Sequence, residues 1–382
     1  MVYVHVPFCR SFCIYCDFYS CIPHKGEDVF KLYTDSLIRE IESRSEELVR
    51  SHCGDSRGEG ALKTLYFGGG TPSVLPSDCL RRITETLARE GLDSFEEFTL
   101  EVNPEDIVSR GESYVKEVLA LGVNRVSMGV QSLDDGILRW MNRRHNASRA
   151  RQAFEILRGA GIGNISVDLI FGISGLADST LKATVEELLS WKPEHISAYQ
   201  LTLAEDSLLG KMAAGGKYLE LPDEDCRRQY ELICTLLGEA GYRHYEVSNW
   251  AIPGREASHN SAYWQRLPYV GLGPGAHSLS LTEGGAQVRR HNLESEDSLH
   301  SGEMPLFEEE ILSAEDIRVE EIMLALRTDR GMQSESLESL CDSKTIAGML
   351  QSGLLETTGP GERIRIPESQ FFVSEGIIRD LI

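Results

Sequence analysis

Three cysteines near the start of the chain have the spacing of a metal-ligand set. Cys9, Cys13 and Cys16 form a C-x3-C-x2-C pattern directly after the apolar run at residues 2–6. Closed cubane clusters have four cysteine ligands, so three thiolates leave one iron with an open position. The pattern therefore predicts an iron–sulfur cluster whose fourth iron can bind a small molecule.

Two other interpretations of these cysteines stay open at this point. A zinc site would favour paired C-x2-C units with a fourth ligand, and unrelated buried cysteines would serve only as packing residues. The spacing favours the cluster over both. The remaining cysteines show no metal-ligand spacing; they are Cys21, Cys53, Cys79, Cys226, Cys234 and Cys341.

The composition restricts the class of protein. At 382 residues the chain is long enough for two or three domains. Its formal net charge of −22 offers no basic surface for phosphates, so we expect no nucleic-acid partner. No long apolar run and no secretory signal stand out, so we expect a cytoplasmic protein with reduced thiols and no transmembrane segment. Transient contact with a membrane stays open.

The first 216 residues alternate short apolar runs with longer amphipathic segments. We expect strands at residues 2–6, 62–67, 97–102, 125–130, 165–171 and 195–203. Helices are expected between them, at 28–49, 77–90, 111–121, 134–143, 147–160 and 179–191. Six successive strand–helix units predict an α/β fold with a parallel sheet and right-handed crossovers. The periodicity does not fix whether that sheet closes.

Beyond residue 216 the pattern changes and divides the chain into two further regions. Residues 217–293 contain a helix at 223–240, a strand at 243–247 and an aromatic loop, which predict an α+β extension. The acidic residues 294–310 predict a linker. Helices at 314–327, 334–340 and 345–353, then paired strands at 364–366 and 371–372, predict a winged-helix-like module ending at residue 382. Without a basic recognition helix, we interpret it as a packing or interaction domain.

Polar residues and glycines gather where the predicted strands end. In barrel-like α/β folds the functional site lies at the carboxyl ends of the strands. The G-G-G-T-P run at 68–72 follows the second strand, and Glu101, Gln131 and Asp168 lie in or after later ones. Each has a structural alternative, such as a tight glycine turn or a satisfied buried carboxylate. Their joint placement favours a ligand pocket, in which carboxylates pair with ammonium or hydroxyl groups.

Several motifs give the sequence a resemblance to a known family. They are Y-V-H-V-P-F-C-R-S-F-C-I-Y-C-D-F-Y-S, G-G-G-T-P, E-V-N-P, G-V-Q-S-L, N-R-R-H, D-L-I-F-G and G-L-G-P-G-A-H-S. Over nearly the whole chain these motifs resemble the HemN/HemW group of radical S-adenosylmethionine (SAM) proteins. The resemblance implies a partial (β/α)6 radical SAM barrel, a [4Fe–4S] cluster and SAM. It also implies an electron donor such as flavodoxin or ferredoxin, whose electron cleaves SAM to methionine and a 5′-deoxyadenosyl radical.

The resemblance assigns roles to individual residues. Cys9, Cys13 and Cys16 would bind the cluster. The residues that would contact the cluster-bound SAM or shape its pocket are Tyr3, Tyr15, Gly69, Gly70, Thr71, Glu101, Gln131, Arg143 and Asp168. In part of the group some of these positions serve a second SAM.

Two branches of the group fit the sequence differently. One is oxygen-independent coproporphyrinogen III oxidase, which removes two propionate carboxyls by radical decarboxylation. Members of that branch have a C-x3-C-x2-C-x-C pattern after a long N-terminal arm. In this sequence Phe18 stands at the position of the last cysteine, and eight residues precede Cys9. Both departures favour the other branch, the HemW-type heme chaperones. The oxidase stays as the alternative function, and we expect the decarboxylation to be absent.

The H-N-S-A-Y-W run at residues 259–264 matches the H-N-x-x-Y-W motif of the heme-binding branch. A loop imidazole can ligate heme iron, and aromatic rings offer flat apolar surfaces for the macrocycle. Without the resemblance, the run fits a surface loop with packed aromatics and a structural histidine. With it, we expect His259, Asn260, Tyr263 and Trp264 to bind heme, which the protein would transfer to an acceptor apoprotein.

Overall fold

A nine-stranded sheet forms the centre of the protein. The computed structural model describes residues 1–23, 28–53, 62–282, 284–359 and 362–382. The strand order of the sheet is β7-β8-β6-β5-β4-β3-β2-β1-β9. Its first six strands in the chain pair in parallel with their sequence neighbours, which confirms the predicted α/β fold. These strands are β1 (Val2–Val6), β2 (Thr64–Gly69), β3 (Glu97–Val102), β4 (Arg125–Gln131), β5 (Ile165–Phe171) and β6 (His195–Gln200).

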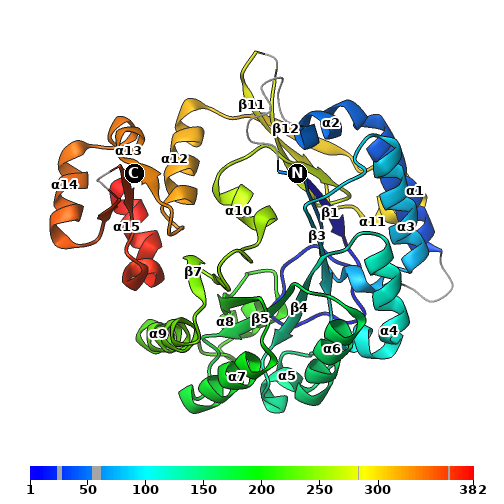
Figure 1. Ribbon diagram of the computed structural model, residues 1–382, viewed down its shortest axis with the longest axis horizontal. Helices are drawn as coiled ribbons and strands as arrows, with labels where there is room; N and C mark the ends of the chain where they lie inside the picture. Colours follow the sequence, from blue (N-terminus) through cyan, green and yellow to red (C-terminus); the bar gives the residue numbers. More distant parts are fainter. Residues whose placement is uncertain (24–27, 54–61, 283, 360–361) are drawn as a thin grey trace.

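Helices cover the outer face of these strands (Figure 1). They are α1 (Val29–Ser43), α2 (Ser45–Cys53), α3 (Ser77–Arg89), α4 (Pro104–Ala120), α5 (Asp135–Trp140), α6 (Ala147–Ala160) and α7 (Asp178–Trp191), with the short 3-10 helix η1 (Pro72–Val74) after β2. Because the helices cover them, strands such as β1 and β2 are buried along most of their length and consist of continuous apolar runs. In the described residues, no helix is long and apolar enough to cross a membrane.

Helix α4 begins seven residues before the predicted start at residue 111. The Asn103 side chain accepts a hydrogen bond from the Glu105 amide (3.1 Å) and caps the helix, and Pro104 occupies its first turn. Gly111 has a φ of 72°, so two helical segments meet there at a kink. The sequence prediction found only the second segment.

The region after residue 216 adds three strands to the large sheet. Strands β7 (Arg243–Glu246) and β8 (Asn249–Ala251) continue it antiparallel beyond β6, and β9 (Val270–Leu272) pairs in parallel with β1. In the described part of the chain, β7 and β9 are its two edges, so the sheet stays open as a partial barrel. Helix α8 (Leu208–Ala214) precedes this region, and its own helices are α9 (Asp223–Glu239) and α10 (Ser258–Trp264).

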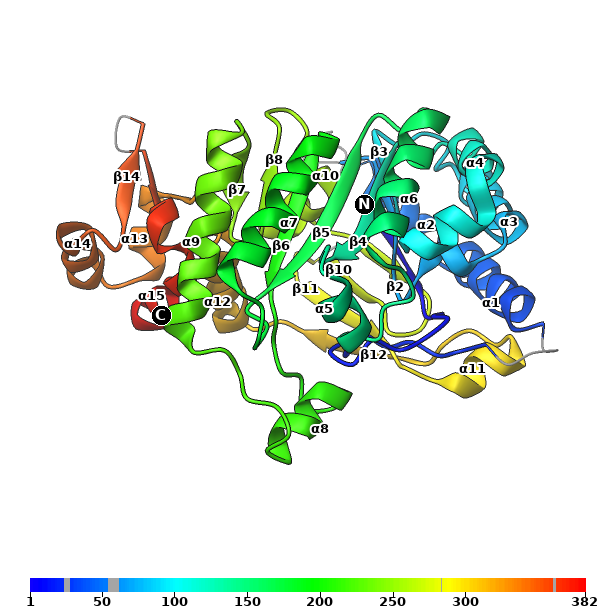
Figure 2. The ribbon, with the colours of Figure 1, turned by 90° about the horizontal axis from the view of Figure 1, so that it is seen from below.

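The predicted acidic linker at 294–310 is wrong, because this segment is folded. It contains α11 (Glu296–Ser301) and β12 (Phe307–Ile311), which pairs antiparallel with β11 (Gln287–Asn292) in a small sheet that β10 (His277–Leu281) completes. The local run of glutamates resembles a linker because β12 is an exposed edge strand, where charged side chains point to solvent. Figure 2 shows β12 and α11 at the end of the barrel where the N-terminal loop lies.

The carboxy-terminal module has the helices and small sheet of a winged-helix-like fold. Its elements are α12 (Ala314–Ala325), β13 (Met332–Gln333), α13 (Ser334–Leu340), α14 (Ser343–Ser352), β14 (Glu356–Thr358), β15 (Arg363–Arg365), η2 (Glu368–Val373) and α15 (Ser374–Leu381). The predicted strand at 371–372 is wrong, since these residues lie in the 3-10 helix η2. Pro367 precedes η2 and cannot donate to a strand ladder, and β14 and β13 pair with β15 instead.

Candidate functional site

The loop that follows β1 holds the three predicted ligand cysteines. Its two ends are joined, since the Cys9 amide donates to the Cys21 carbonyl (2.9 Å) and the Cys21 amide donates to the Pro7 carbonyl (2.7 Å). In the middle of the loop, the Ile14 carbonyl accepts from the Leu209 amide of α8 (2.7 Å). The backbone therefore fixes the loop at the carboxyl ends of the parallel strands, where barrel-type sites are built.

All three cysteines are free and line one cavity of about 950 Å³. Arg143 Nη1 lies 3.3 Å from Cys13 Sγ, and Cys9 Sγ lies 3.4 Å from Thr71 Oγ1. Burial raises the pKa of the Cys9 thiol, and burial raises the pKa of Cys16 to about 11. Iron would stabilise the thiolate forms that burial disfavours, so this set suits metal ligation rather than free thiolate chemistry.

The cavity fits an iron–sulfur cluster with a polar ligand beside it. In the residues that the structure describes, no three His, Cys, Asp or Glu side chains converge on a single metal-ion position. A zinc site would bring all of its ligands to one ion. In a cubane cluster each cysteine binds a different iron, so the ligands stand apart. The same cavity contains Gln131 Oε1 and Arg143 Nε, which are both buried without a hydrogen-bond partner.

The glycine turn after β2 lets the cysteine loop and the strand approach closely. The Gly70 amide donates to the Val6 carbonyl (2.9 Å). A Cβ at Gly70 would lie 2.8 Å from Val6 O and 2.9 Å from the backbone N and O of Phe8, contacts that the backbone cannot relieve. Gly69 has a φ of 104° and would place a Cβ 2.6 Å from the His5 ring. The turn is thus needed for packing, and its residues also line the cavity.

Two buried carboxyl groups lie in the same cavity. Glu101 Oε1 accepts a hydrogen bond from the Tyr66 hydroxyl (2.7 Å), and burial raises the pKa of Glu101 to about 7. Asp168 accepts from the Ser127 hydroxyl (3.2 Å), and burial raises its pKa as well. A cationic ligand such as an ammonium or sulfonium would favour the ionised forms of both groups.

Gln131 is held by an irregular strand end. The register of β4 against β5 shifts between Gly129 and Gln131, and Gln131 has a φ of 67°, which is rare for a residue other than glycine. Arg143 Nη2 donates to the Gly129 carbonyl (2.6 Å) and holds this bulge. A Cβ at Gly129 would lie 2.9 Å from Gln131 Nε2 and 3.2 Å from Arg143 Nη2. The strained backbone therefore positions two polar side chains at the cavity wall.

Nearly all of the predicted cluster and SAM residues come together at this cavity. Those that line it are Cys9, Cys13, Tyr15, Cys16, Gly69, Gly70, Thr71, Glu101, Gln131, Arg143 and Asp168. Tyr3 is not among the lining residues; its hydroxyl is hydrogen-bonded to His5 Nδ1 (3.2 Å), and its ring lies 6.0 Å from that of Tyr66. Tyr3 therefore supports the pocket wall from behind. Contact of each residue with SAM stays a prediction.

Tyr66, Arg125 and Tyr199 are among the lining residues that sequence reasoning missed. Arg125 is 1% exposed, and its Nε and Nη1 atoms are buried without a partner. The sequence did contain a signal for Arg125, because it is a charged residue at the start of an apolar strand. A buried arginine needs anionic neighbours, so its position indicates a polar site. Tyr66 and Tyr199 lie within predicted strands, and no local pattern distinguishes an inward-facing tyrosine from a packing residue.

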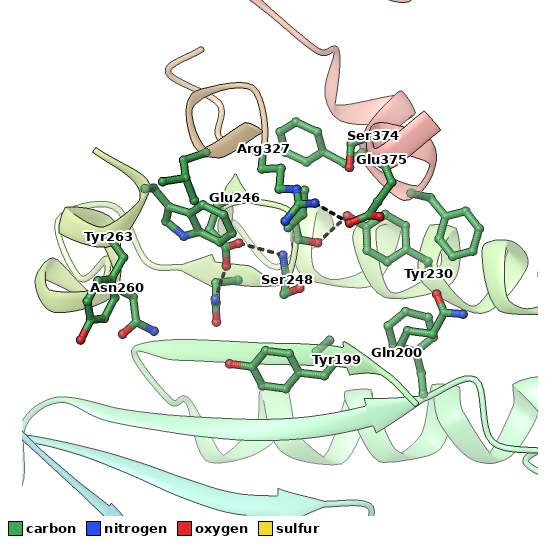
Figure 3. A pocket seen from close by; sticks show the side chains of 18 residues that line it. Tyr199, Gln200, Tyr230, Glu246, Ser248, Asn260, Tyr263, Arg327, Ser374 and Glu375 are labelled. Carbon is green, nitrogen blue, oxygen red and sulfur yellow. Dashed lines mark hydrogen bonds and ion pairs between the residues drawn. The ribbon is translucent and has the colours of Figure 1, made fainter. Parts of the chain in front are cut away.

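A second cavity of about 620 Å³ lies between β6, α10 and the carboxy-terminal module. Asn260, Tyr263 and Trp264 line it, which brings three of the four predicted heme residues to one place. Figure 3 shows Tyr199 and Gln200 of β6 on one side of this cavity and Arg327, Ser374 and Glu375 on the other. The two cavities share part of their walls; the residues common to both are Tyr199, Gln200, Ser248 and Asn260.

His259 lies behind this second cavity rather than in it. The predicted loop is the helix α10, and the His259 side chain is buried with 1% exposed. Its Nδ1 is hydrogen-bonded to Thr64 Oγ1 (2.7 Å) and its Nε2 to the Tyr263 hydroxyl (3.0 Å). Both ring nitrogens are therefore occupied by protein partners. In this arrangement the ring supports Tyr263, and binding of heme by His259 itself stays a prediction.

The N-terminal half of the chain matches a known family model. Residues 3–188 match the model of the radical SAM superfamily. The heme chaperone HemW of Lactococcus lactis is 34% identical over 344 residues, which cover 88% of this chain and 84% of that protein. The heme chaperone HemW of Mycobacterium tuberculosis is 30% identical over 384 residues, which cover 100% of this chain and 94% of that protein.

A solved structure shares the fold over nearly the whole chain. The coproporphyrinogen III oxidase HemN from Escherichia coli, a radical SAM enzyme, aligns with a TM-score of 0.76. The alignment covers 99% of this chain and 89% of that chain at 20% sequence identity. At this identity, the likeness concerns the fold alone.

Proposed function

The chain belongs to the HemW family of radical SAM proteins, and from this premise we propose that it binds heme and passes it to an acceptor apoprotein. The observation that carries the proposal is the 620 Å³ cavity beside the cluster cavity, lined by residues of the H-N-x-x-Y-W motif. Its volume lies in the range of cavities that hold small cofactors. The shared wall would place heme next to the SAM site.

The lining of this cavity suits a flat apolar macrocycle. Aromatic side chains come from five separate elements and include Trp264 of α10, Tyr199 of β6, and Phe371 and Phe372 of η2. Rings of this kind offer large apolar faces and favour stacked or edge contacts with another ring system. His259 supports the site indirectly, since its hydrogen bond orients the Tyr263 hydroxyl.

The neighbouring cavity has the residues for a [4Fe–4S] cluster and SAM. Cys9, Cys13 and Cys16 would hold the cluster, which with SAM supplies one-electron reductive chemistry. Glu101 and Asp168 would bind the cationic and hydroxyl groups of the ligand, because both carboxyls are buried in the lining. The strand ends and the glycine turn would keep water from this region by close packing.

We also propose a reducing compartment and a one-electron donor. The three cysteines of the cluster loop are free, which suits the cytoplasm. Phe12 and Phe18 lie at the cluster cavity and are 51% and 67% exposed. Exposed apolar side chains beside a redox site offer a contact surface for a flavodoxin or ferredoxin. The heme acceptor would be a separate apoprotein.

An anaerobic heme titration tests the proposal. Trp264→Ala should weaken heme binding about tenfold or more, because a buried aromatic contact of this size contributes roughly 1.5–3 kcal/mol. Trp140→Ala is the matched control, since Trp140 is half-buried on α5 against Tyr218 and outside this cavity. Equal affinity in wild type and Trp264→Ala would contradict the heme site. Anaerobic turnover of coproporphyrinogen III to protoporphyrinogen IX would instead establish the oxidase.

A further inference from the structure

The 620 Å³ cavity is lined by two acidic side chains and one basic side chain. Among the described lining residues, Glu246, Arg327 and Glu375 are the charged ones, so Arg327 is the only cation. Heme is apolar except for its iron and two ionised propionates. A guanidinium is the side chain best suited to bind a carboxylate, because its paired N–H groups match the two carboxylate oxygens.

The backbone of Arg327 is fixed against the barrel extension, whereas its side chain faces the cavity. The Val247 amide donates to the Arg327 carbonyl (3.0 Å), and Thr328 forms an antiparallel bridge with Glu246. The Arg327 side chain is 22% exposed and extends toward the space above β6 (Figure 3). The position of the guanidinium is thus set by both the barrel and the carboxy-terminal module.

The present partner of Arg327 is a weak one. Arg327 Nη2 donates to Glu375 Oε1, but the Glu375 side chain is 80% exposed. Solvent screens an ion pair with such an exposed partner, so its contribution is small. The other nearby carboxyl, Glu246, already accepts hydrogen bonds from the Ser248 amide and the Asn249 side chain. A ligand carboxylate inside the cavity would therefore compete with Glu375 for the hydrogen bond of the guanidinium, while Glu246 already interacts with its charge.

We propose that Arg327 binds a propionate of heme. In the protein without heme, the Glu375 carboxylate occupies the place on Arg327 that the propionate takes. The inference rests on the proposed function and deepens it by naming the group that orients the ligand. Arg327 follows α12, and Glu375 lies on α15. The carboxy-terminal module thereby gains a direct part in holding the ligand.

The test compares heme with heme dimethyl ester, in which both propionates are neutral. Arg327→Gln should weaken heme binding about tenfold or more, because a hydrogen-bonded charge pair is lost, and leave ester binding unchanged. Glu375→Gln should strengthen heme binding several-fold, since its competition ends, again without effect on the ester. Arg379→Gln is the control: Arg379 is 82% exposed on the same helix α15 and outside the lining, and neither affinity should change.

The outcomes separate this inference from the proposed function. If Trp264→Ala leaves heme binding unchanged, the heme site itself is wrong. If Trp264→Ala weakens both ligands but Arg327→Gln changes the heme and ester affinities equally, only the propionate contact is wrong. Arg327→Lys, which keeps the charge but not the paired donors, should give an intermediate heme affinity. That variant and Glu375→Gln keep the test decisive if Arg327→Gln fails to fold.

Discussion

Replacing His259 with alanine tests whether this side chain supports the cavity or ligates iron. The substitution removes the partner of the buried Thr64 hydroxyl (2.7 Å) and of the Tyr263 hydroxyl (3.0 Å). Each orphaned buried group costs about 1–3 kcal/mol, and the lost ring leaves a cavity besides. We therefore expect the free energy of unfolding to fall by about 3–5 kcal/mol at pH 7.5, measured by denaturant titration of the protein without heme.

The pH dependence of that loss gives an independent readout. Burial lowers the pKa of His259 from its ordinary 6.5 to about 3. Between these values the unfolded chain binds a proton that the folded chain does not, so the neutral ring stabilises the fold fully above pH 6.5 and progressively less as the pH falls toward 3. At pH 5 the wild type has lost about 2 kcal/mol of this contribution, at 1.36 kcal/mol per pH unit. The difference between wild type and His259→Ala should shrink accordingly from pH 7.5 to pH 5.

The heme spectrum separates support from ligation. If His259 only positions Tyr263, the substitution His259→Ala should change the heme affinity. It should leave unchanged the ligand-field spectrum of the heme that still binds. His277→Ala is the control, because His277 is exposed, and it should stay within about 0.5 kcal/mol of wild type. Suppose that His259→Ala is as stable as that control and that the spectrum of its bound heme shifts. The ring would then be an iron ligand, and the reasoning from its hydrogen bonds would be refuted.

Three further results are expected. Replacing Cys9, Cys13 and Cys16 together by serine should abolish the iron–sulfur absorbance after anaerobic reconstitution; retained absorbance would show that other ligands hold the cluster. The wild type should bind SAM more tightly at pH 8 than at pH 6, because Glu101, whose pKa is about 7, ionises between these values. Calorimetry should find no such pH dependence of the SAM affinity in Glu101→Gln. An equal pH dependence in both proteins would exclude Glu101 as its source. Gly70→Ala should lose about 1–3 kcal/mol of stability and part of its cluster content, because the added Cβ meets backbone atoms at 2.8–2.9 Å. An unchanged melting temperature would contradict that packing.

The parallel strands and the cluster cavity could be predicted because their signals are local. Buried parallel strands are continuous apolar runs, and their carboxyl ends must meet at one edge of the sheet. Residues that lie in or directly after different strands, such as Gly70, Glu101 and Asp168, therefore come together at the cavity as expected. The three cysteines lie in a single loop, so their spacing alone fixes their proximity.

Other features could not be predicted because they depend on contacts between distant segments. The role of His259 depends on Thr64, a partner 195 positions away, and no motif shows that both ring nitrogens are occupied. Strand β12 resembles a linker because its backbone order comes from pairing with β11, which composition does not record. Arg327 was missed for the same reason, since its partner Glu375 lies on another helix of the module.

The shared wall of the two cavities has a thermodynamic consequence. Tyr199, Gln200, Ser248 and Asn260 face both spaces, so a ligand that moves any of them on one side alters the site on the other. Binding linkage is reciprocal: the factor by which SAM changes the affinity for heme equals the factor by which heme changes the affinity for SAM. Two titrations, each repeated with the other ligand present, would measure one and the same coupling free energy. That quantity determines whether SAM retains the heme or promotes its release.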